Sequence, residues 1–178
     1  MEHEQLEALV REHGKAVYGF CLRLAGKEAD ADDLYQETFV KAVELNRELD
    51  GGRNPKAFLL SVAVGLHRNR LRKAAWRQRI APAGEFAEEA VAARDESASP
   101  EEALLLRERR NRLLGAAERL DERLRIPLYL HYTADLSVEE IAALLRIPQG
   151  TVKSRLHKAR KRIKSLLEED PLEFERPF

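Results

Sequence analysis

The chain of 178 residues has a single cysteine, Cys21, and no long apolar run. One cysteine cannot form an internal disulfide, and because Cys21 lies among apolar residues we expect a buried structural thiol rather than a redox sensor. No segment approaches the ~18 apolar residues of a membrane span. The N-terminus is acidic and lacks the apolar core of a signal peptide. We therefore expect a cytoplasmic chain without membrane insertion.

Motifs of common enzyme sites are also missing. The five histidines are scattered, and the sequence contains no HExxH, CxxC, P-loop or GxSxG motif. An enzyme is therefore the least favoured class, and we expect no catalysis, no cofactor and no metal. His67 and His157 lie in basic stretches, which favours nucleic-acid contacts or a solvated surface over metal ligation.

The alternating pattern of a β-strand occurs nowhere, whereas helical periods recur throughout. The predicted fold is all-α, with two small helical bundles at residues 1–80 and 104–170. Residues 82–100 are rich in Ala, Glu and Ser and have no apolar stripe, so we expect an acidic flexible linker at residues 81–103. Each bundle is near the size at which one core is only marginally stabilising.

Net charge carries no information about a partner, because 31 Lys and Arg balance 31 Asp and Glu. Their distribution is more informative. Residues 51–84 contain eight basic groups and no acid, whereas residues 81–106 contain seven acids and one Arg. A second acid-free stretch, residues 141–167, contains eight Lys or Arg. The pattern predicts two basic surfaces separated by an acidic segment.

Residues 136–163 have the pattern of a helix, a tight turn and a second helix. Ser137 and Glu140 form a Ser-x-x-Glu capping box at the start of the first helix. Pro148 disfavours helical geometry in the residue before it and fits the start of the second helix. The apolar stripe of that second helix is expected to comprise Val152, Leu156, Ala159 and Ile163.

The remaining faces of this second helix are basic. A solvated basic helix is the alternative interpretation, but here the basic run coincides with the capping box, the turn and the apolar stripe. That combination favours a helix-turn-helix whose second helix enters a DNA major groove.

The first half of the chain is predicted to contain three helices. The first ends at Gly26, and Asp30 is expected to cap the second. The early turns of the second helix carry the acids Asp32, Asp33 and Glu37. Because the helix dipole favours negative charge there, these acids taken alone predict only a solvated face. Leu34 and Phe39 belong to the apolar stripe of the same helix.

A loop at residues 49–55 precedes a long basic helix at residues 56–79. The residues expected to face inward on it are Phe58, Leu59, Val62, Ala63, Leu66 and Leu71. Trp76 lies among basic residues, where it could cover the core as a lid or stack on an unpaired base; the sequence leaves both alternatives open. In the second half, helices are predicted at residues 103–120 and 121–133, with a kink or late start at Pro127.

Three segments of the sequence resemble a known family, the extracytoplasmic-function (ECF) sigma factors of bacterial RNA polymerase. DADDLYQETFVKA (30–42) and KAFLLSVAVGLHRNRLRK (56–73) resemble sigma region 2. LDERLRIPLYLHYTADLSVEEIAALLRIPQGTVKSRLHKARKRI (120–163) resembles region 4. The resemblance implies a sigma factor that directs promoter recognition and transcription initiation. Its implied partners are bacterial core RNA polymerase, promoter DNA and an anti-sigma factor.

The resemblance also implies roles for particular residues. Those expected to bind polymerase are Asp32, Asp33, Leu34, Gln36, Glu37 and Phe39, with Val40 as a further candidate. Those expected at the −10 element are Arg53, Asn54, Lys56, Asn69, Arg72, Lys73 and Trp76. Those expected at the −35 element are Gln149, Thr151, Lys153, Ser154, Arg155, His157, Lys158 and Lys161.

Three positions depart from the family pattern. Gly65 stands where Asn is frequent, Asn69 where Asp is frequent, and Asp121 where Pro is frequent.

Two other function classes explain less of the sequence. A one-component helix-turn-helix regulator that does not bind polymerase would leave the first 80 residues unexplained. A helical adaptor without DNA contact would leave both acid-free basic stretches unexplained.

The reach of the linker yields one further expectation. As a flexible coil, its 23 residues would span ~25 to 30 Å. Two turns of DNA between promoter elements cover ~70 Å. Polymerase is therefore expected to hold the two bundles apart, and the free chain is expected to bind promoter DNA poorly.

Overall fold

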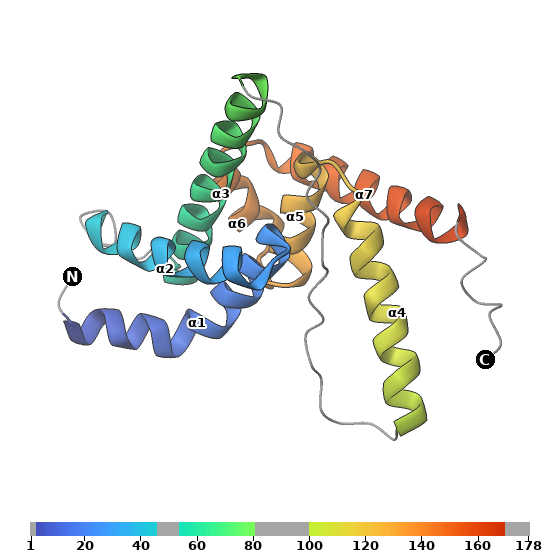
Figure 1. The fold of residues 1–178 in the computed structure, drawn as a ribbon, viewed down its shortest axis with the longest axis horizontal. Coiled ribbons are helices and arrows are strands. Elements are labelled where there is room, and N and C mark those ends of the chain that lie inside the picture. The colour runs from blue at the N-terminus through green and yellow to red at the C-terminus, as the bar shows by residue number, and fades with distance from the viewer. Residues whose placement is uncertain (1–2, 46–53, 81–99, 170–178) are drawn as a thin grey trace.

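A computed structural model describes residues 3–45, 54–80 and 100–169, which form helices and no strand. The helices are α1 (His3–Ala25), α2 (Glu28–Glu44), α3 (Pro55–Ile80), α4 (Pro100–Glu118), α5 (Glu122–Tyr132), α6 (Val138–Leu145) and α7 (Gln149–Glu169) (Figure 1). The predicted all-α fold is confirmed. Arg53 and most of the predicted linker lie outside the described residues. None of the described helices is long and apolar enough to cross a membrane.

The first group of helices is α1, α2 and α3, which pack against one another. Their shared core contains Val17, Phe20, Leu34 and Leu59, all fully buried. Cys21 is buried there too, and this burial raises the pKa of its thiol to about 12. The prediction that this thiol is buried is therefore confirmed.

The ends of α1 and α2 differ in how well local sequence signals predicted them. Gly26 has φ of 76° and donates its N–H to the carbonyl of Leu22 at 3.0 Å, as expected for a glycine that ends a helix. The prediction that Asp30 caps α2 is wrong. The helix begins at Glu28 with Lys27 at the N-cap, so Asp30 lies in its first turn, where a negative charge is still favourable.

The second group contains α4 to α7, with α7 packed against the other three. α5 runs from Glu122 to Tyr132 through Pro127, which is buried among apolar neighbours. A late start of the helix at Pro127 is therefore wrong. Burial of Ile126, Leu128 and Leu130 on either side offsets the missing hydrogen bond of the proline.

The helix-turn-helix is present as predicted. Ser137 Oγ accepts from the N–H of Glu140 at 3.1 Å, and Glu140 Oε2 accepts from the N–H of Ser137 at 2.8 Å, so the capping box is complete. α6 ends at Arg146 in the left-handed conformation, with φ of 55°. The turn then passes Pro148, and α7 starts at Gln149. This turn fixes the direction of α7 and hence the face it presents to solvent.

The two groups are in contact with each other through α3 with α6 and α1 with α5 (Figure 1). Beyond this contact, α3 projects past the bundle, and every residue from 71 to 79 is exposed.

Candidate polymerase and nucleic-acid interfaces

The exposed face of α2 is acidic and carries Asp32, Asp33, Gln36 and Glu37. Leu34 and Phe39 lie on the opposite side and are buried. Their burial contradicts the expectation that both side chains contact polymerase. Both belong to the apolar stripe of α2, which packs into the core. Val40 is 61% exposed and is the apolar side chain that borders the acids.

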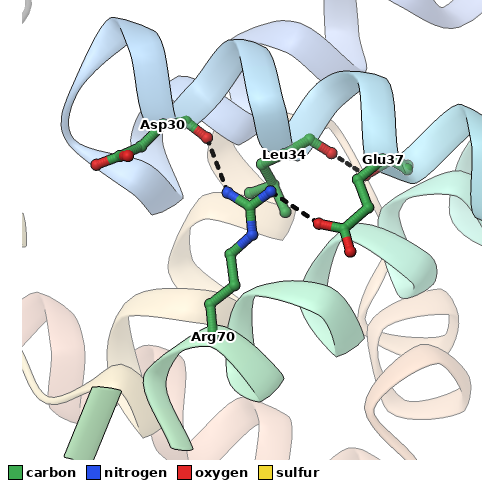
Figure 2. A network of polar contacts seen from close by, with 5 residues as sticks. Asp30, Leu34, Glu37 and Arg70 are labelled. Atoms are coloured by element: carbon green, nitrogen blue, oxygen red, sulfur yellow. Dashed lines mark hydrogen bonds and ion pairs between the residues drawn. The ribbon is translucent and has the colours of Figure 1, made fainter. Parts of the chain in front are cut away.

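Two of the three acids on this face already have partners within the chain. The hydroxyl of Tyr18 on α1 donates to Asp32 at 2.8 Å, and this bond raises the pKa of Tyr18. The guanidinium of Arg70 donates to Glu37 at 2.8 Å and to the carbonyl of Asp30 at 3.1 Å, which ties α3 to α2 (Figure 2). Asp33 has no hydrogen-bond or ion-pair partner within the described residues. Of the three, Asp33 is the acid that is free to meet a basic partner.

The start of α3 is fixed by Asn54. Its Oδ1 accepts from the N–H groups of Lys56 at 3.1 Å and Ala57 at 3.3 Å, which caps the helix. Its Nδ2 donates to Oε1 of Glu140 at 2.6 Å. The backbone N–H of Ser137 and then this amide lower the pKa of Glu140, so its carboxylate stays charged. Asn54 is thus engaged twice within the chain, whereas Lys56 is half-buried.

The far end of α3 presents one polar face with an aromatic residue in it. Asn69, Arg72, Lys73 and Trp76 line a shallow hollow of about 450 Å³. Arg72 donates to Oδ1 of Asn69. Trp76 is 64% exposed, so the interpretation of this residue as a lid over the core is wrong. The other alternative, stacking of its exposed ring on an unpaired base, remains.

Two assignments on α3 are wrong. Leu71, expected to face inward, is exposed because this part of the helix extends past its neighbours. His67, expected to contact nucleic acid or solvent, is only 6% exposed, and burial, together with the charges of Arg125, Arg70 and Arg68, lowers its pKa to about 4. Around His67, α3 packs against α1 and against the second half of the chain. Sequence periodicity alone does not indicate these contacts.

The recognition helix α7 is rotated as predicted. Val152, Leu156 and Ala159 are buried, whereas Ile163 is only partly buried and Leu166 extends the apolar stripe. The side chains exposed on the other side are Gln149, Lys153, Ser154, His157, Lys158 and Lys161. Thr151 and Arg155 are half-buried at its margins.

Two N–H groups in the first turn of α7 are already bonded within the chain. Those of Thr151 and Val152 donate to the carbonyl of Pro148 at 2.9 and 3.2 Å. A phosphate at this end could therefore use the N–H groups of Gln149 and Gly150. Further along, Arg160 donates to the hydroxyl of Tyr132 at 3.3 Å, whereas Lys161 is exposed.

The chain matches the family models for Sigma-70 region 2 over residues 9–77 and Sigma-70, region 4 over residues 110–163. It is 31% identical over 169 residues to the ECF RNA polymerase sigma factor SigL of Mycobacterium tuberculosis, with 92% of this chain and 89% of that protein covered. The chain belongs to the ECF sigma factors. It is also 32% identical to the RNA polymerase sigma-H factor of Pseudomonas aeruginosa, over 91% of this chain and 86% of that protein.

Solved structures have the same fold. The sigma factor RpoE, in a co-crystal with the anti-sigma factor NepR from Bartonella quintana, superposes with a TM-score of 0.77 at 24% identity, over 94% of this chain and 99% of that one. CnrH, in complex with the cytosolic domain of CnrY, superposes with a TM-score of 0.66 over 95% of this chain and 91% of that one. The family models and the curated relatives confirm the resemblance identified from the sequence, and the chain is a sigma factor of RNA polymerase.

Proposed function

We propose that this sigma factor uses α2 to bind core RNA polymerase, α3 to engage the −10 element and α7 to read the −35 element, with domains at residues 1–80 and 104–170 and a linker at 81–103. The observation that carries the proposal is that one chain combines an exposed acidic face on α2 with an exposed basic strip on α7, the helix that follows the capped helix α6 in the helix-turn-helix. It acts in the cytoplasm, where it redirects polymerase and catalyses nothing itself.

On α2, Asp33 is the central contact, with Gln36 and Val40 beside it. Asp32 and Glu37 belong to the same surface but are held in place by Tyr18 and Arg70. An exposed carboxylate without a partner can meet a basic surface on polymerase directly, whereas a paired one must first give up its partner.

On α3, Arg72 and Lys73 neutralise phosphates while Trp76 stacks on a base of the opened strand. Asn69 supplies a side-chain amide at the same hollow. Asn54 and Lys56, together with Arg53, meet the −10 element at the other end of the helix.

On α7, Lys153, Ser154, His157 and Lys158 form one strip of side chains suited to base edges. Lys donates to guanine O6 and N7, and His157 donates or stacks on a thymine methyl. Gln149, Thr151, Arg155 and Lys161 flank this strip and contact phosphate.

An anti-sigma factor is a further proposed partner. The similar sigma factor RpoE was solved in complex with the anti-sigma factor NepR, and the similar chain CnrH in complex with the cytosolic domain of CnrY. The alternative function, a one-component regulator that does not bind polymerase, is not favoured, because α1 to α3 match sigma region 2.

The experiment is transcription of genomic DNA by core polymerase with and without the purified chain, followed by sequencing of RNA 5′ ends. We expect new start sites that share two upstream elements. The Asp33→Lys variant should not produce them. If start sites are unchanged by the wild-type chain, and core polymerase does not co-purify with it, the proposal is wrong and the one-component regulator takes its place.

A further inference from the structure

Tyr18 of α1 contributes a side chain to the acidic face of α2. Its hydroxyl donates to Oδ1 of Asp32 at 2.8 Å, across a separation of 14 positions in the sequence. Because this bond is exposed, water can replace it at little cost, so it adds little to the stability of the fold. Its main effect is to fix the orientation of the Asp32 carboxylate.

The ring of Tyr18 is itself held in place by two further aromatic side chains. It packs edge to face on Tyr35, with ring centroids 5.5 Å apart, and Tyr35 packs in the same manner on Phe39 at 5.0 Å. Phe39 is buried in the core. We refer to Tyr18, Tyr35 and Phe39 as the aromatic row. Since edge-to-face packing favours particular ring orientations, the row connects the hydroxyl of Tyr18 to the rigid core.

Gly14 of α1 makes room for the middle ring of the aromatic row. This glycine is buried, and a Cβ built on it would lie 2.8 Å from the hydroxyl oxygen of Tyr35, which is closer than real Cβ contacts come. Because Gly14 has no side chain, Tyr35 can lie against α1, where its ring supports Tyr18. The orientation of Asp32 is therefore determined by α1 and α2 together, in the chain without any partner.

The bond from Tyr18 differs in kind from the ion pair that holds Glu37. Arg70 brings a positive charge to Glu37, which offsets the negative charge that a basic partner would meet (Figure 2). Tyr18 is neutral, and its bond to Asp32 raises its pKa, so the hydroxyl keeps its proton at neutral pH. That hydroxyl occupies only Oδ1 of Asp32. Asp32 can therefore accept from a cation through Oδ2 while Tyr18 stays in place.

We propose that Tyr18 is a positioning residue for polymerase binding: its hydroxyl holds Asp32 in the orientation in which this carboxylate accepts from a cationic side chain of core polymerase. The inference rests on the proposed function of α2. A side chain that is ordered before binding loses less conformational entropy when the complex forms. For one side chain this advantage corresponds to about a two- to tenfold lower Kd.

The first test removes only the hydroxyl. Tyr18→Phe keeps the ring in the aromatic row, so the melting temperature should stay within about 2 °C of the wild-type value. We expect the Kd of the full chain for core polymerase to rise about two- to tenfold. Tyr35→Phe is the matched control, because it removes a hydroxyl of the same row that lies against Gly14 rather than on Asp32. An unchanged Kd for Tyr18→Phe, or an equal rise for Tyr35→Phe, would overturn the proposal.

The second test asks whether Tyr18 acts through Asp32. Asp32→Ala should weaken polymerase binding, and Tyr18→Phe should then add no further loss, because the carboxylate that it positions is gone. Salt dependence gives an independent measurement: Asp32→Ala should reduce the dependence of the Kd on salt, whereas Tyr18→Phe changes no charge and should leave it as in the wild type. Equal losses from Tyr18→Phe with and without Asp32 would mean that the hydroxyl acts by another route, and the proposal would be wrong.

Failure of the proposed function has a different signature. If α2 does not bind polymerase, Asp33→Lys binds it as tightly as the wild-type chain does. If Asp33→Lys does not bind but Tyr18→Phe binds like the wild type, α2 is the contact and only the role of Tyr18 is wrong.

Discussion

Neighbouring acids on α2 have different surroundings, and this difference gives them different roles. Asp33 is exposed and has no partner within the described residues, whereas Glu37 forms an ion pair with Arg70, whose guanidinium also binds the carbonyl of Asp30 (Figure 2). The sequence predicted the same role for both acids, because no local feature indicates that Glu37 contacts Arg70, which lies 33 positions away.

Charge reversal should separate these two roles. Asp33→Lys should abolish holoenzyme assembly and leave the melting temperature nearly unchanged, since no partner is lost. Glu37→Lys should in addition destabilise the chain by about 1 kcal/mol, because it places two cations together where an exposed ion pair stood. Assembly is measured by co-purification with core polymerase and stability by thermal unfolding. Glu108→Lys, an exposed acid on α4, is the matched control.

A charge swap provides the internal check. Glu37→Lys combined with Arg70→Glu should recover the stability lost in Glu37→Lys alone. If Asp33→Lys still binds polymerase normally, the acidic face of α2 is not the contact.

His67 makes stability depend on pH. Its pKa in the folded chain is about 4, against an unfolded value near 6.5, so between these pH values the unfolded state binds more protons. Stability is therefore greatest above pH 6.5 and falls as the pH drops towards 4, by up to roughly 3 kcal/mol from this group. His67→Gln should flatten the dependence of the unfolding free energy on pH between 4 and 6.5. An unchanged slope in that variant would mean that carboxylates alone produce it.

At the scale of the helix, local signals predicted well wherever the controlling contact lies within a few residues. The capping box of α6, the glycine that ends α1 and the buried stripe of α7 all depend on such neighbours. Leu71 and His67 were misassigned because burial along α3 depends on where other helices end. The cap of α2 was misplaced by three residues, because the side chain of Lys27 makes no capping hydrogen bond at the N-cap position.

We expect alanine substitutions on the recognition helix α7 to have two kinds of effect. Lys153→Ala or His157→Ala should cost ~1 to 3 kcal/mol at the −35 element and relax its sequence preference. Lys161→Ala should weaken binding about equally on all sequences and lower the salt slope by ~1. Transcription from a library of −35 variants by each mutant holoenzyme measures both effects. A changed preference for Lys161→Ala alone would mean that another face of α7 meets the bases.

At the scale of the whole molecule, the all-α fold and both family segments were predicted from periodicity and from the resemblance. The contact between the halves was not, because Asn54 and Glu140 are 86 residues apart and each looks like an ordinary helix cap. The same limit applies to Arg68 and Glu122, whose pairing depends on how two separately predicted bundles meet.

The short reach of the linker predicts weak DNA binding by the free chain. We expect promoter fragments to bind no more tightly than scrambled ones, with Kd values of ~10⁻⁴ to 10⁻⁶ M at physiological salt, because only one basic surface engages at a time. Gel shifts with both fragments, with and without core polymerase, measure this. Nanomolar binding specific to the promoter by the isolated chain would contradict it.

The only tryptophan of the sequence, Trp76, gives this sigma factor a built-in optical probe. Its indole is largely in water and lies beside Arg72 and Lys73, so its emission should be that of a hydrated ring. Stacking on a base would quench that emission, whereas duplex DNA, whose bases are already stacked on one another, would not. Titration of the free chain with single-stranded and duplex oligonucleotides of the same sequence would therefore report strand capture without any attached label, and stopped-flow mixing would time it.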